Sequence, residues 1–289
     1  GGLLLKFAKI LGKENVREGF FGQEINLTTY NLARINMFLH NIDYNNFSIE
    51  RGDTLIHPAH WNDEPFDAIV SNPPYSIKWA GKSNPLLIND ERFAPAGVLA
   101  PESKADLAFT MHMLSWLSPK GTAAIVEFPG VLYRGGAEQK IRKYMIDNNF
   151  VDAVIQLPSD LFFGTSIATC ILLLKKNKLD NNILFVDASS EYVRNTNKNK
   201  LSEENINNII SLLKDRKSVE NKSYLATYDE IKDNDYNISV NSYLRANIED
   251  KKIDINEVNR KLAEIVPRQQ QIREELEEVI KELEVDYHE

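Results

Sequence analysis

Cysteine is almost absent from this sequence, because Cys170 is the only one in 289 residues. A single cysteine excludes a disulfide framework within the chain and any zinc site built from cysteines. The surrounding segment, IATCILLLKK, is apolar and predicts a buried strand. We therefore expect an inert core thiol rather than a nucleophile.

Long apolar runs, secretory signals and histidine clusters are missing as well. No apolar run reaches the length of a membrane span and no secretory signal is recognisable, which favours a cytoplasmic protein. None of the five histidines stands at a spacing typical of metal ligands. The nearest pair, His57 and His60, lies beside Pro58 and favours ordinary surface. We expect no bound metal.

The net charge of −8 argues at first against a nucleic-acid partner. Residues 251–289 carry seven Lys and Arg against eleven Asp and Glu, however, so half of the negative excess lies in that tail. A basic surface on residues 1–250 is compatible with the total, and charge does not decide the partner. The length predicts one large domain, residues 1–250, followed by an appendage, residues 251–289.

Short apolar segments alternate with helical patterns along most of the chain. The predicted strands cover residues 19–24, 48–55, 66–71, 122–128, 151–157, 167–174 and 182–186. The predicted helices lie within residues 1–11, 25–42, 105–117 and 136–148. This order predicts an α/β fold with a doubly wound, mostly parallel sheet. We expect residues 76–103 to form a long loop and residues 191–225 a polar, peripheral excursion.

The segment VSNPPYSI continues the predicted strand 66–71 with Asn72, Pro73, Pro74 and Tyr75. Neither proline has an N–H to donate, so strand pairing must end there and the chain leaves the sheet as a stiff turn. Ligands of open α/β sheets usually bind beyond the carboxyl ends of the strands. An ordinary turn is the alternative, but the position and the rarity of the motif favour a site.

The loop offers two hydrogen-bond acceptors on a rigid frame, the Asn72 amide oxygen and the Pro73 carbonyl. Two acceptors suit an –NH2 group such as the exocyclic amine of adenine. This nitrogen is a poor nucleophile because its lone pair is delocalised into the ring. Holding both hydrogens aims the lone pair at a bound electrophile, so catalysis is mostly positioning and charge stabilisation. The Tyr75 ring suits stacking on a planar base.

Two carboxylates stand at the ends of the preceding strands. Glu24 closes the first strand and is placed to accept from two ribose hydroxyls, and Asp53 follows the second and could accept from an adenine amino group. Each alone is a weak signal, because carboxylates at strand ends are common. With Asn72 they form an ordered set at three successive strand ends, which is more specific.

Several segments, in order along nearly the whole chain, resemble the N6-adenine DNA methyltransferases, specifically the modification subunit of type I restriction-modification systems. The segments are GGLLLKFAKILG, GQEINLTTYNLARINMFLHNI, GDTL, FDAIVSNPPYS, LPSDLFFGTSIATCILLLKK and ISVNSYL. NPPY alone is typical of amino-methyltransferases in general. The resemblance implies a class I, Rossmann-like sheet that moves a methyl group from S-adenosylmethionine to adenine N6 of a base flipped out of double-stranded DNA.

The resemblance also implies roles for individual residues. Glu24 binds the ribose of S-adenosylmethionine and Asp53 its adenine amino group. Asn72 and Pro73 hold the target amine, and Tyr75 stacks on the flipped base. Phe162 matches the family's second aromatic residue, with core packing beside Phe163 as the alternative. Pro74 is a further expected site residue in the loop. The other residues expected on the cofactor side are Gly1, Gly2, Ile25, Thr54 and also Asn72.

The family's first motif is represented only by its last two glycines, Gly1 and Gly2. The acidic residue, the proline and the strand that precede them are not in the sequence, so we expect a fragment of a longer protein. The partners that the resemblance implies are double-stranded DNA, a specificity subunit that selects the DNA sequence, a restriction subunit and a second modification subunit.

Two other functions remain open at this point. A methyltransferase acting on a glutamine side-chain amide would use the same loop, although it would not need the polar excursion or the C-terminal helix. A non-catalytic binding module could keep the fold, because half of the first motif is missing.

The C-terminal segment has apolar residues in alternating steps of three and four, which predicts a coiled-coil-like helix that binds a partner. The predicted seam consists of Ile255, Val258, Leu262, Ile265, Gln269, Ile272, Leu276, Val279 and Leu283. Pro267 is expected to kink the helix or to split it. A helix packed back on its own sheet is the alternative.

Overall fold

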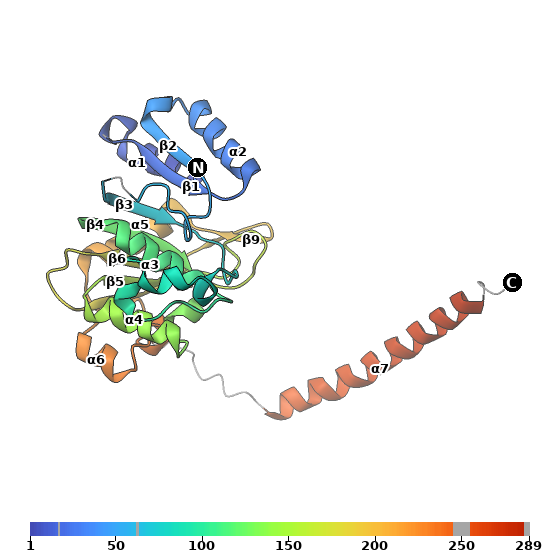
Figure 1. Cartoon of the computed structure of the whole chain (residues 1–289). Helices are drawn as coiled ribbons and strands as arrows, with labels where there is room; N and C mark the ends of the chain where they lie inside the picture. The colour runs from blue at the N-terminus through green and yellow to red at the C-terminus, as the bar shows by residue number, and fades with distance from the viewer. Residues whose placement is uncertain (17, 62–63, 245–254, 286–289) are drawn as a thin grey trace. The chain divides into compact units, whose positions relative to one another are not determined.

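The helices and strands are drawn in Figure 1, a computed structural model that describes residues 1–16, 18–61, 64–244 and 255–285. The chain divides into two units, Gly1–Arg245 and Ala246–Glu289. The boundary predicted between residues 250 and 251 lies outside the described residues.

The larger sheet of the first unit has its described strands in the order β10-β7-β5-β6-β4-β3. These strands are β3 (Phe66–Ser71), β4 (Leu117–Glu127), β5 (Val151–Gln156), β6 (Cys170–Lys175), β7 (Ile183–Asp187) and β10 (Ser223–Ala226). β3 and β4 are parallel, as are β5 and β7, whereas β6 is antiparallel to both of its neighbours and β10 is antiparallel to β7. β3, β4, β5 and β7 therefore share one direction, and the predicted mostly parallel α/β sheet is confirmed.

The helices lie where the sequence predicts them. The α-helices of this unit are α1 (Gly2–Leu11), α2 (Leu27–Leu39), α3 (Asp106–Trp116), α4 (Ala137–Asp147), α5 (Glu203–Asp215) and α6 (Tyr228–Asp233). Short 3-10 helices are η1 (Lys13–Asn15), η2 (Tyr44–Asn46), η3 (Gly81–Ser83), η4 (Pro85–Asn89), η5 (Ala94–Ala96), η6 (Pro129–Leu132) and η7 (Val240–Ser242). The first four α-helices match the four predicted ones.

Each face of the larger sheet has its own hydrophobic core, because successive side chains of a strand point to opposite sides. On β6, Leu172 and Leu174 belong to a core that also contains buried side chains of α3, α4 and α6. Ile171 and Leu173 pack instead against a second core that includes Ile209 of α5. Helices therefore cover both faces, as the doubly wound prediction requires.

A second, smaller sheet pairs β1 (Phe20–Glu24) with β2 (Phe47–Arg51) in parallel, and in Figure 1 it forms the upper layer of the unit together with α1 and α2. Asn26 caps α2, with its Oδ1 atom accepting a hydrogen bond from the Thr29 N–H at 3.0 Å. The layer has a small core of Ala8, Phe20, Ala33, Met37, Ile42, Phe47 and Ile49. Of α2, Ala33 and Met37 are buried in this core, whereas Leu27 is exposed.

The separation of the two sheets differs from the expected single sheet. Among the described strands, β1 pairs only with β2, and β3 is the edge strand of the larger sheet. Ring contacts connect the two layers, with the Phe21 ring 5.2 Å from the Phe66 ring and 5.3 Å from the His60 ring, centroid to centroid. Local sequence patterns identify strands but not their partners, which is why the separation was not predicted.

The segment expected to be a long loop and the segment expected to be peripheral both belong to the body of the unit. Residues 76–103 contain η3, η4 and η5, and Leu87, Phe93 and Leu99 of this segment are buried in the main core. Residues 191–225 contain α5, a short hairpin of β8 (Val193–Asn195) and β9 (Lys198–Lys200), and the edge strand β10. The peripheral prediction is wrong for α5 and β10, because both pack on the larger sheet.

The second unit contains α7 (Ile255–Val285), a helix that runs through Pro267 without interruption. Of the two outcomes expected at Pro267, the split is wrong, because the helix is continuous, and the kink stays a prediction. A proline removes one backbone hydrogen bond, and the turns on either side keep theirs. Of the predicted seam, Leu262, Ile265, Ile272 and Leu276 are each more than half exposed. The side chains of the remaining apolar seam positions, Ile255, Val258, Val279 and Leu283, lie outside the description. No described helix is long and apolar enough to cross a membrane.

Candidate active site

The NPPY loop leaves the carboxyl end of β3 as the sequence predicts. Asn72 and Pro74 are exposed, Pro73 is buried and Tyr75 is half-buried. The Tyr75 hydroxyl donates a hydrogen bond to Asn72 Oδ1 at 2.6 Å. The acceptor oxygen of Asn72 is therefore engaged by a hydroxyl group at the surface.

Asp106, at the start of α3, holds the chain immediately after the loop. Ser76 has a φ of 50°, in the left-handed region that non-glycine residues seldom adopt. Its N–H donates to Asp106 Oδ1 at 2.9 Å, and the Ala105 N–H donates to the Ile77 carbonyl at 2.9 Å. Asp106 is 1% exposed. Sequence reasoning missed this residue, because an acidic residue in the first turn is ordinary for any helix.

A second buried carboxyl group, Glu127, lies at the end of β4. The Thr110 hydroxyl donates to Glu127 Oε1 at 2.6 Å, whereas Glu127 Oε2 and Asp106 Oδ2 have no hydrogen-bond partner among the described residues. Burial, with a smaller contribution from the Asp106 charge, raises the pKa of Glu127 to about 8. Glu127 is therefore protonated at neutral pH.

The hydroxyl group of Tyr75 also stays protonated at neutral pH. Burial, followed by the charge of Glu127, raises the pKa of Tyr75 to about 12. A phenol can donate to Asn72, whereas a phenolate could only accept. Burial of the Tyr75 hydroxyl thus favours the hydrogen bond that the loop contains.

The two carboxylates of the cofactor side lie at the ends of the small sheet. Glu24 Oε1 accepts from the Asn26 N–H at 2.8 Å, and the Glu24 carbonyl accepts from the Gly52 N–H at 3.1 Å. Asp53 Oδ1 accepts from the Leu55 N–H at 2.9 Å. The other oxygens, Glu24 Oε2 and Asp53 Oδ2, form no hydrogen bond within the described part of the chain. Each carboxylate thus keeps one oxygen for a ligand.

The remaining residues expected on the cofactor side lie near these carboxylates in different settings. Gly1 packs on α2, where an added Cβ would meet the Ala33 carbonyl oxygen at 3.4 Å, whereas a Cβ on Gly2 would meet open space. The Gly1 backbone nitrogen lies within electrostatic range of the Glu24 carboxylate. Ile25 is 64% exposed.

Helix α3 connects the two groups of site residues. Its first residue, Asp106, binds the chain after the NPPY loop, and His112 Nε2, further along the same helix, lies 2.8 Å from Thr54 Oγ1. Asn72 and Glu24 belong to different sheets, and one helix touches the loops of both. This shared support was not visible in the sequence.

The loop after β5 carries two neighbouring aromatic residues, one packed and one exposed. Phe162 packs against the core on the α5 face, and Phe163 is 100% exposed. The packing of Phe162 favours the core alternative for this residue, although its neighbour is in solvent rather than beside it in the core. Because β3, β4 and β5 run in one direction, the loop after β5 lies at the same sheet edge as Asn72.

The expectation of an ordinary surface location is wrong for one of the two neighbouring histidines. His57 is exposed, but His60 is 4% exposed and its Nε2 atom lies 3.0 Å from the Gly22 carbonyl oxygen. The apolar rings of Phe21 and Phe66, on the facing strands of the two sheets, surround it. In the described part of the chain, no group of three or more His, Cys, Asp or Glu residues could hold a metal ion.

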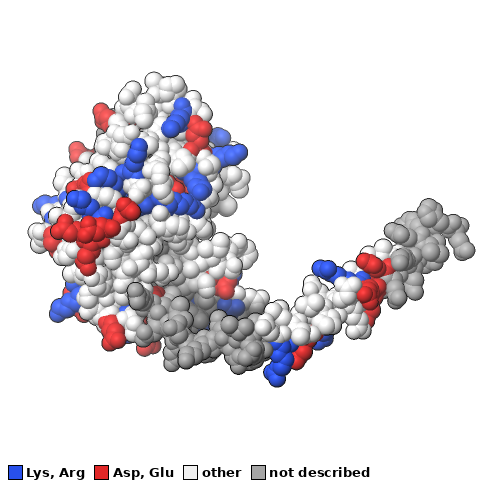
Figure 2. Space-filling model, turned by 90° about the horizontal axis from the view of Figure 1, so that it is seen from below, with Lys and Arg blue, Asp and Glu red and all other residues white. Residues whose placement is uncertain are grey.

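Charges are mixed over the molecular surface drawn in Figure 2. Basic side chains form a loose row across the upper part of this face, with acidic side chains directly beside them and wide uncharged areas around both. Charge on this face therefore does not mark a nucleic-acid surface by itself.

An α/β fold with NPPY after β3, Glu24 at the end of β1 and Asp53 after β2 is the arrangement of an amino-methyltransferase. The family described as N-6 DNA Methylase matches residues 1–252. The chain belongs to this family.

Proteins similar to this chain include methylase subunits of type I restriction enzymes. The chain is 48% identical to the MpnII methylase subunit of Mycoplasma pneumoniae, covering 99% of this chain and 54% of that protein. It is 32% identical to the MjaVII methylase subunit of Methanocaldococcus jannaschii, covering 89% and 46%. The crystal structure of a type I methyltransferase subunit from Streptococcus thermophilus superimposes with a TM-score of 0.79 at 40% identity, covering 84% and 52%. The chain spans about half the length of these proteins.

Proposed function

We propose that this chain is the catalytic part of a type I modification subunit that transfers a methyl group from S-adenosylmethionine to adenine N6 in double-stranded DNA. The NPPY loop carries the proposal. Its Asn72 amide oxygen is exposed and is engaged by a single hydroxyl, and the Pro73 carbonyl is its neighbour along the chain. Membership of the N-6 DNA methylase family supports the same reaction.

The residues of the small sheet fit the proposed cofactor. Ribose hydroxyls and an adenine amino group donate hydrogen bonds, and Glu24 Oε2 and Asp53 Oδ2 are acceptors without a partner among the described residues. In this proposal Glu24 holds the ribose and Asp53 the amino group, while Gly1, Gly2, Ile25 and Thr54 line the same side. S-adenosylmethionine would supply the methyl group.

The NPPY loop would hold the target amine. Asn72 Oδ1 and the Pro73 carbonyl accept its two hydrogens, so the nitrogen lone pair points away from the loop toward the electrophile. An entering adenine replaces the Tyr75 hydroxyl as the donor to Asn72 Oδ1, and the Tyr75 ring is then placed to stack on the base. The base must first leave the duplex, because N6 is otherwise shielded by stacking and pairing.

Methyl transfer from radiolabelled S-adenosylmethionine tests the proposed reaction. The full-length protein, together with its proposed specificity subunit, is incubated with double-stranded DNA or with a glutamine-containing protein substrate. We expect label in DNA, recovered as N6-methyladenine after digestion to nucleosides. Label in the protein substrate alone would identify a glutamine methyltransferase, and cofactor binding without any transfer would identify a binding module.

We also propose that α7 binds the specificity subunit, and that the complex includes a second modification subunit and the restriction subunit. The exposed side chains of Leu262, Ile265, Ile272 and Leu276 support this proposal, because they lie in a narrow seam between charged residues. Removal of residues 251–289 should leave the methyltransferase domain folded and prevent assembly. Size-exclusion chromatography with the specificity subunit measures this, and a stable complex of the truncated protein would contradict it.

A further inference from the structure

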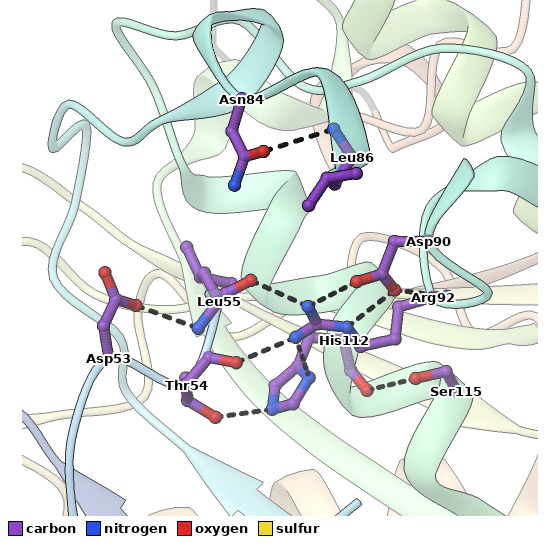
Figure 3. Close-up of polar contacts among 9 residues, drawn as sticks. All are labelled: Asp53, Thr54, Leu55, Asn84, Leu86, Asp90, Arg92, His112 and Ser115. Carbon is purple, nitrogen blue, oxygen red and sulfur yellow. Dashed lines mark hydrogen bonds and ion pairs between the residues drawn. The ribbon is translucent and has the colours of Figure 1, made fainter. Parts of the chain in front are cut away.

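A buried arginine from the segment between β3 and α3 reaches the loop that carries Asp53. Arg92 is 1% exposed and donates from Nη1 to the Thr54 carbonyl and from Nη2 to the Leu55 carbonyl, each at 2.8 Å. Figure 3 shows these three residues with the Asp53 side chain beside them. Both residues that follow Asp53 are therefore bound to one guanidinium group.

Asp90 holds the other edge of the same guanidinium. Arg92 Nε donates to Asp90 Oδ1 at 2.8 Å, and Nη2 donates to Asp90 Oδ2 at 2.7 Å. Burial acts to raise the pKa of Asp90, but the hydrogen bonds and charge of Arg92 lower it overall. The guanidinium carbon also lies 4.7 Å from the Phe93 ring centroid. The orientation of Arg92 is thus fixed by a paired carboxylate and by packing.

His112 of α3 adds a third connection to the same loop. Its Nδ1 atom lies 3.2 Å from Arg92 Nη1, and its Nε2 atom lies 2.8 Å from Thr54 Oγ1. Arginine can only donate, so Nδ1 accepts and the hydrogen of the neutral imidazole resides on Nε2, from which it donates to Thr54. Burial, followed by the charge of Arg92, lowers the pKa of His112 to about 3, which keeps the ring neutral.

These contacts determine where the Asp53 carboxylate points. Asp53 Oδ1 accepts from the Leu55 N–H at 2.9 Å, and the carbonyl of the same Leu55 accepts from Arg92. The Asp53 carbonyl accepts from the His57 N–H at 2.8 Å, which closes the turn. The peptide between Thr54 and Leu55 carries both the Thr54 carbonyl, which accepts from Arg92, and the Leu55 N–H, which donates to Asp53. A rotation of this peptide would break the Arg92 contact and move the Asp53 side chain.

We propose that Arg92 is a positioning residue that aims Asp53 at the amino group of the cofactor's adenine, with Asp90 and His112 orienting Arg92. The inference rests on the proposed function, which assigns the adenine amino group to Asp53. Burying a charge is unfavourable, and a well-packed apolar residue of similar volume would often stabilise such a site as well. Lysine has a single charged nitrogen and cannot reproduce the planar fork that spans two carbonyls and a carboxylate.

Binding of two nucleoside thioethers distinguishes a positioning role from a general stabilising one. S-adenosylhomocysteine carries the adenine amino group, and its inosine analogue carries an oxygen there instead. Isothermal titration of the full-length protein gives the Kd of each. We expect wild type to prefer the adenosine form by at least about tenfold, and Asp53→Ala to lose that preference. Arg92→Lys should lose most of the preference while binding the inosine form within about twofold of wild type.

Arg142→Lys is the matched control. Arg142 is also 1% exposed and donates to backbone carbonyls, those of Tyr236 at 2.9 Å, Val131 at 2.9 Å and Arg134 at 2.7 Å. We expect Arg142→Lys to lower the Tm while leaving the preference for the adenosine form unchanged. In the Asp53→Ala protein, Arg92→Lys should cause no further change in preference, because the two residues act on one interaction.

The outcomes distinguish a failure of the positioning role of Arg92 from a failure of the proposed function. Equal weakening of both ligands by Arg92→Lys, or no change in preference, would overturn the positioning role while leaving the proposed function in place. Failure of wild type to bind S-adenosylhomocysteine would overturn the proposed function and this inference with it. If Arg92→Lys does not fold, Asp90→Asn keeps the shape of the side chain and should reduce the preference about threefold.

Discussion

The two sheets of the first unit position their site residues in different ways. The larger sheet is buried on both faces, and the NPPY loop extends from one of its strands, β3. The small sheet has one modest core and leaves several apolar side chains in solvent, among them Ile10, Leu32 and Leu39, which are 60% to 82% exposed. The target-amine side therefore stands on an extensive core, with Asp106 holding the chain after the loop, whereas the cofactor side has little core and needs another source of order.

Polar contacts to neighbouring elements supply that order on the cofactor side. The Gln23 side chain donates to the His57 carbonyl at 2.8 Å and accepts from the Ala59 N–H at 3.0 Å. Arg92 holds the carbonyls of Thr54 and Leu55. Hydrogen bonds depend on geometry more strictly than apolar contacts do, so a small core can still present its carboxylates in fixed directions.

Substitution of Asn72 should have the largest effect, and it should impair methyl transfer without impairing cofactor binding. We expect Asn72→Ala to lower kcat by about 10²–10³, because one preorganised contact to the reacting amine is lost. Cofactor affinity should stay close to wild type, since Glu24 and Asp53 lie on the other sheet. Single-turnover methylation and cofactor titration measure the two quantities. Near wild-type turnover would contradict the role of Asn72, and Tyr75→Ala should also impair transfer, by less than Asn72→Ala.

Glu24→Ala is the reciprocal test on the small sheet. Loss of charge-assisted hydrogen bonds to the ribose should raise the Kd for S-adenosylmethionine about 10- to 100-fold. Turnover at saturating cofactor should change much less, because the NPPY loop is untouched. An unchanged Kd would show that Glu24 is an ordinary surface carboxylate and would contradict its assignment to the cofactor side.

Substitutions of the two aromatic residues after β5 should affect different properties, stability for Phe162 and DNA binding for Phe163. Phe162 is packed against the core, so Phe162→Ala should lower the free energy of unfolding by about 1–3 kcal/mol. Phe163→Ala should leave stability unchanged and weaken DNA binding about tenfold, as the loss of one base-stacking ring does. Chemical denaturation and fluorescence anisotropy with DNA measure the two effects. Loss of methylation in Phe162→Ala at full stability would instead restore the role on the base that the resemblance implies for this residue.

The last expected effect is a pH dependence of stability in the larger sheet. The pKa of Glu127 is raised from 4.5 to about 8 in the folded protein, so the folded state binds more protons than the unfolded state between these values. Its stabilising contribution is complete below pH 4.5 and is lost as pH rises through about 8. We expect the Tm to fall over this range, and to fall less in Glu127→Gln. Hydrogen exchange in β4 and β6 should follow the same pH dependence more closely than exchange in β1 and β2.

The sequence is sufficient to predict the helices and strands as far as β7 and the residues that stand at strand ends. Alternation of apolar segments with helical patterns predicts β1 to β7 and α1 to α4, and rare residue types mark Asn72 to Tyr75. The supporting residues are distant in the chain, since Arg92 and His112 contact Thr54 across 38 and 58 positions. No local pattern encodes such pairs. For the same reason the pairing of β1 with β2 alone was not predictable, because strand partners depend on contacts between distant segments.

The buried Cys170 makes this chain convenient for site-directed labelling. Its thiol lies on β6 between β4 and β5, is 0% exposed, and has a pKa raised by burial and by the charge of Glu127. Reactive dyes attack thiolates, so the folded chain should leave this position unmodified. A cysteine introduced on the surface could then carry a fluorophore without any background substitution in these 289 residues. Modification of Cys170 itself would report the opening of the larger sheet.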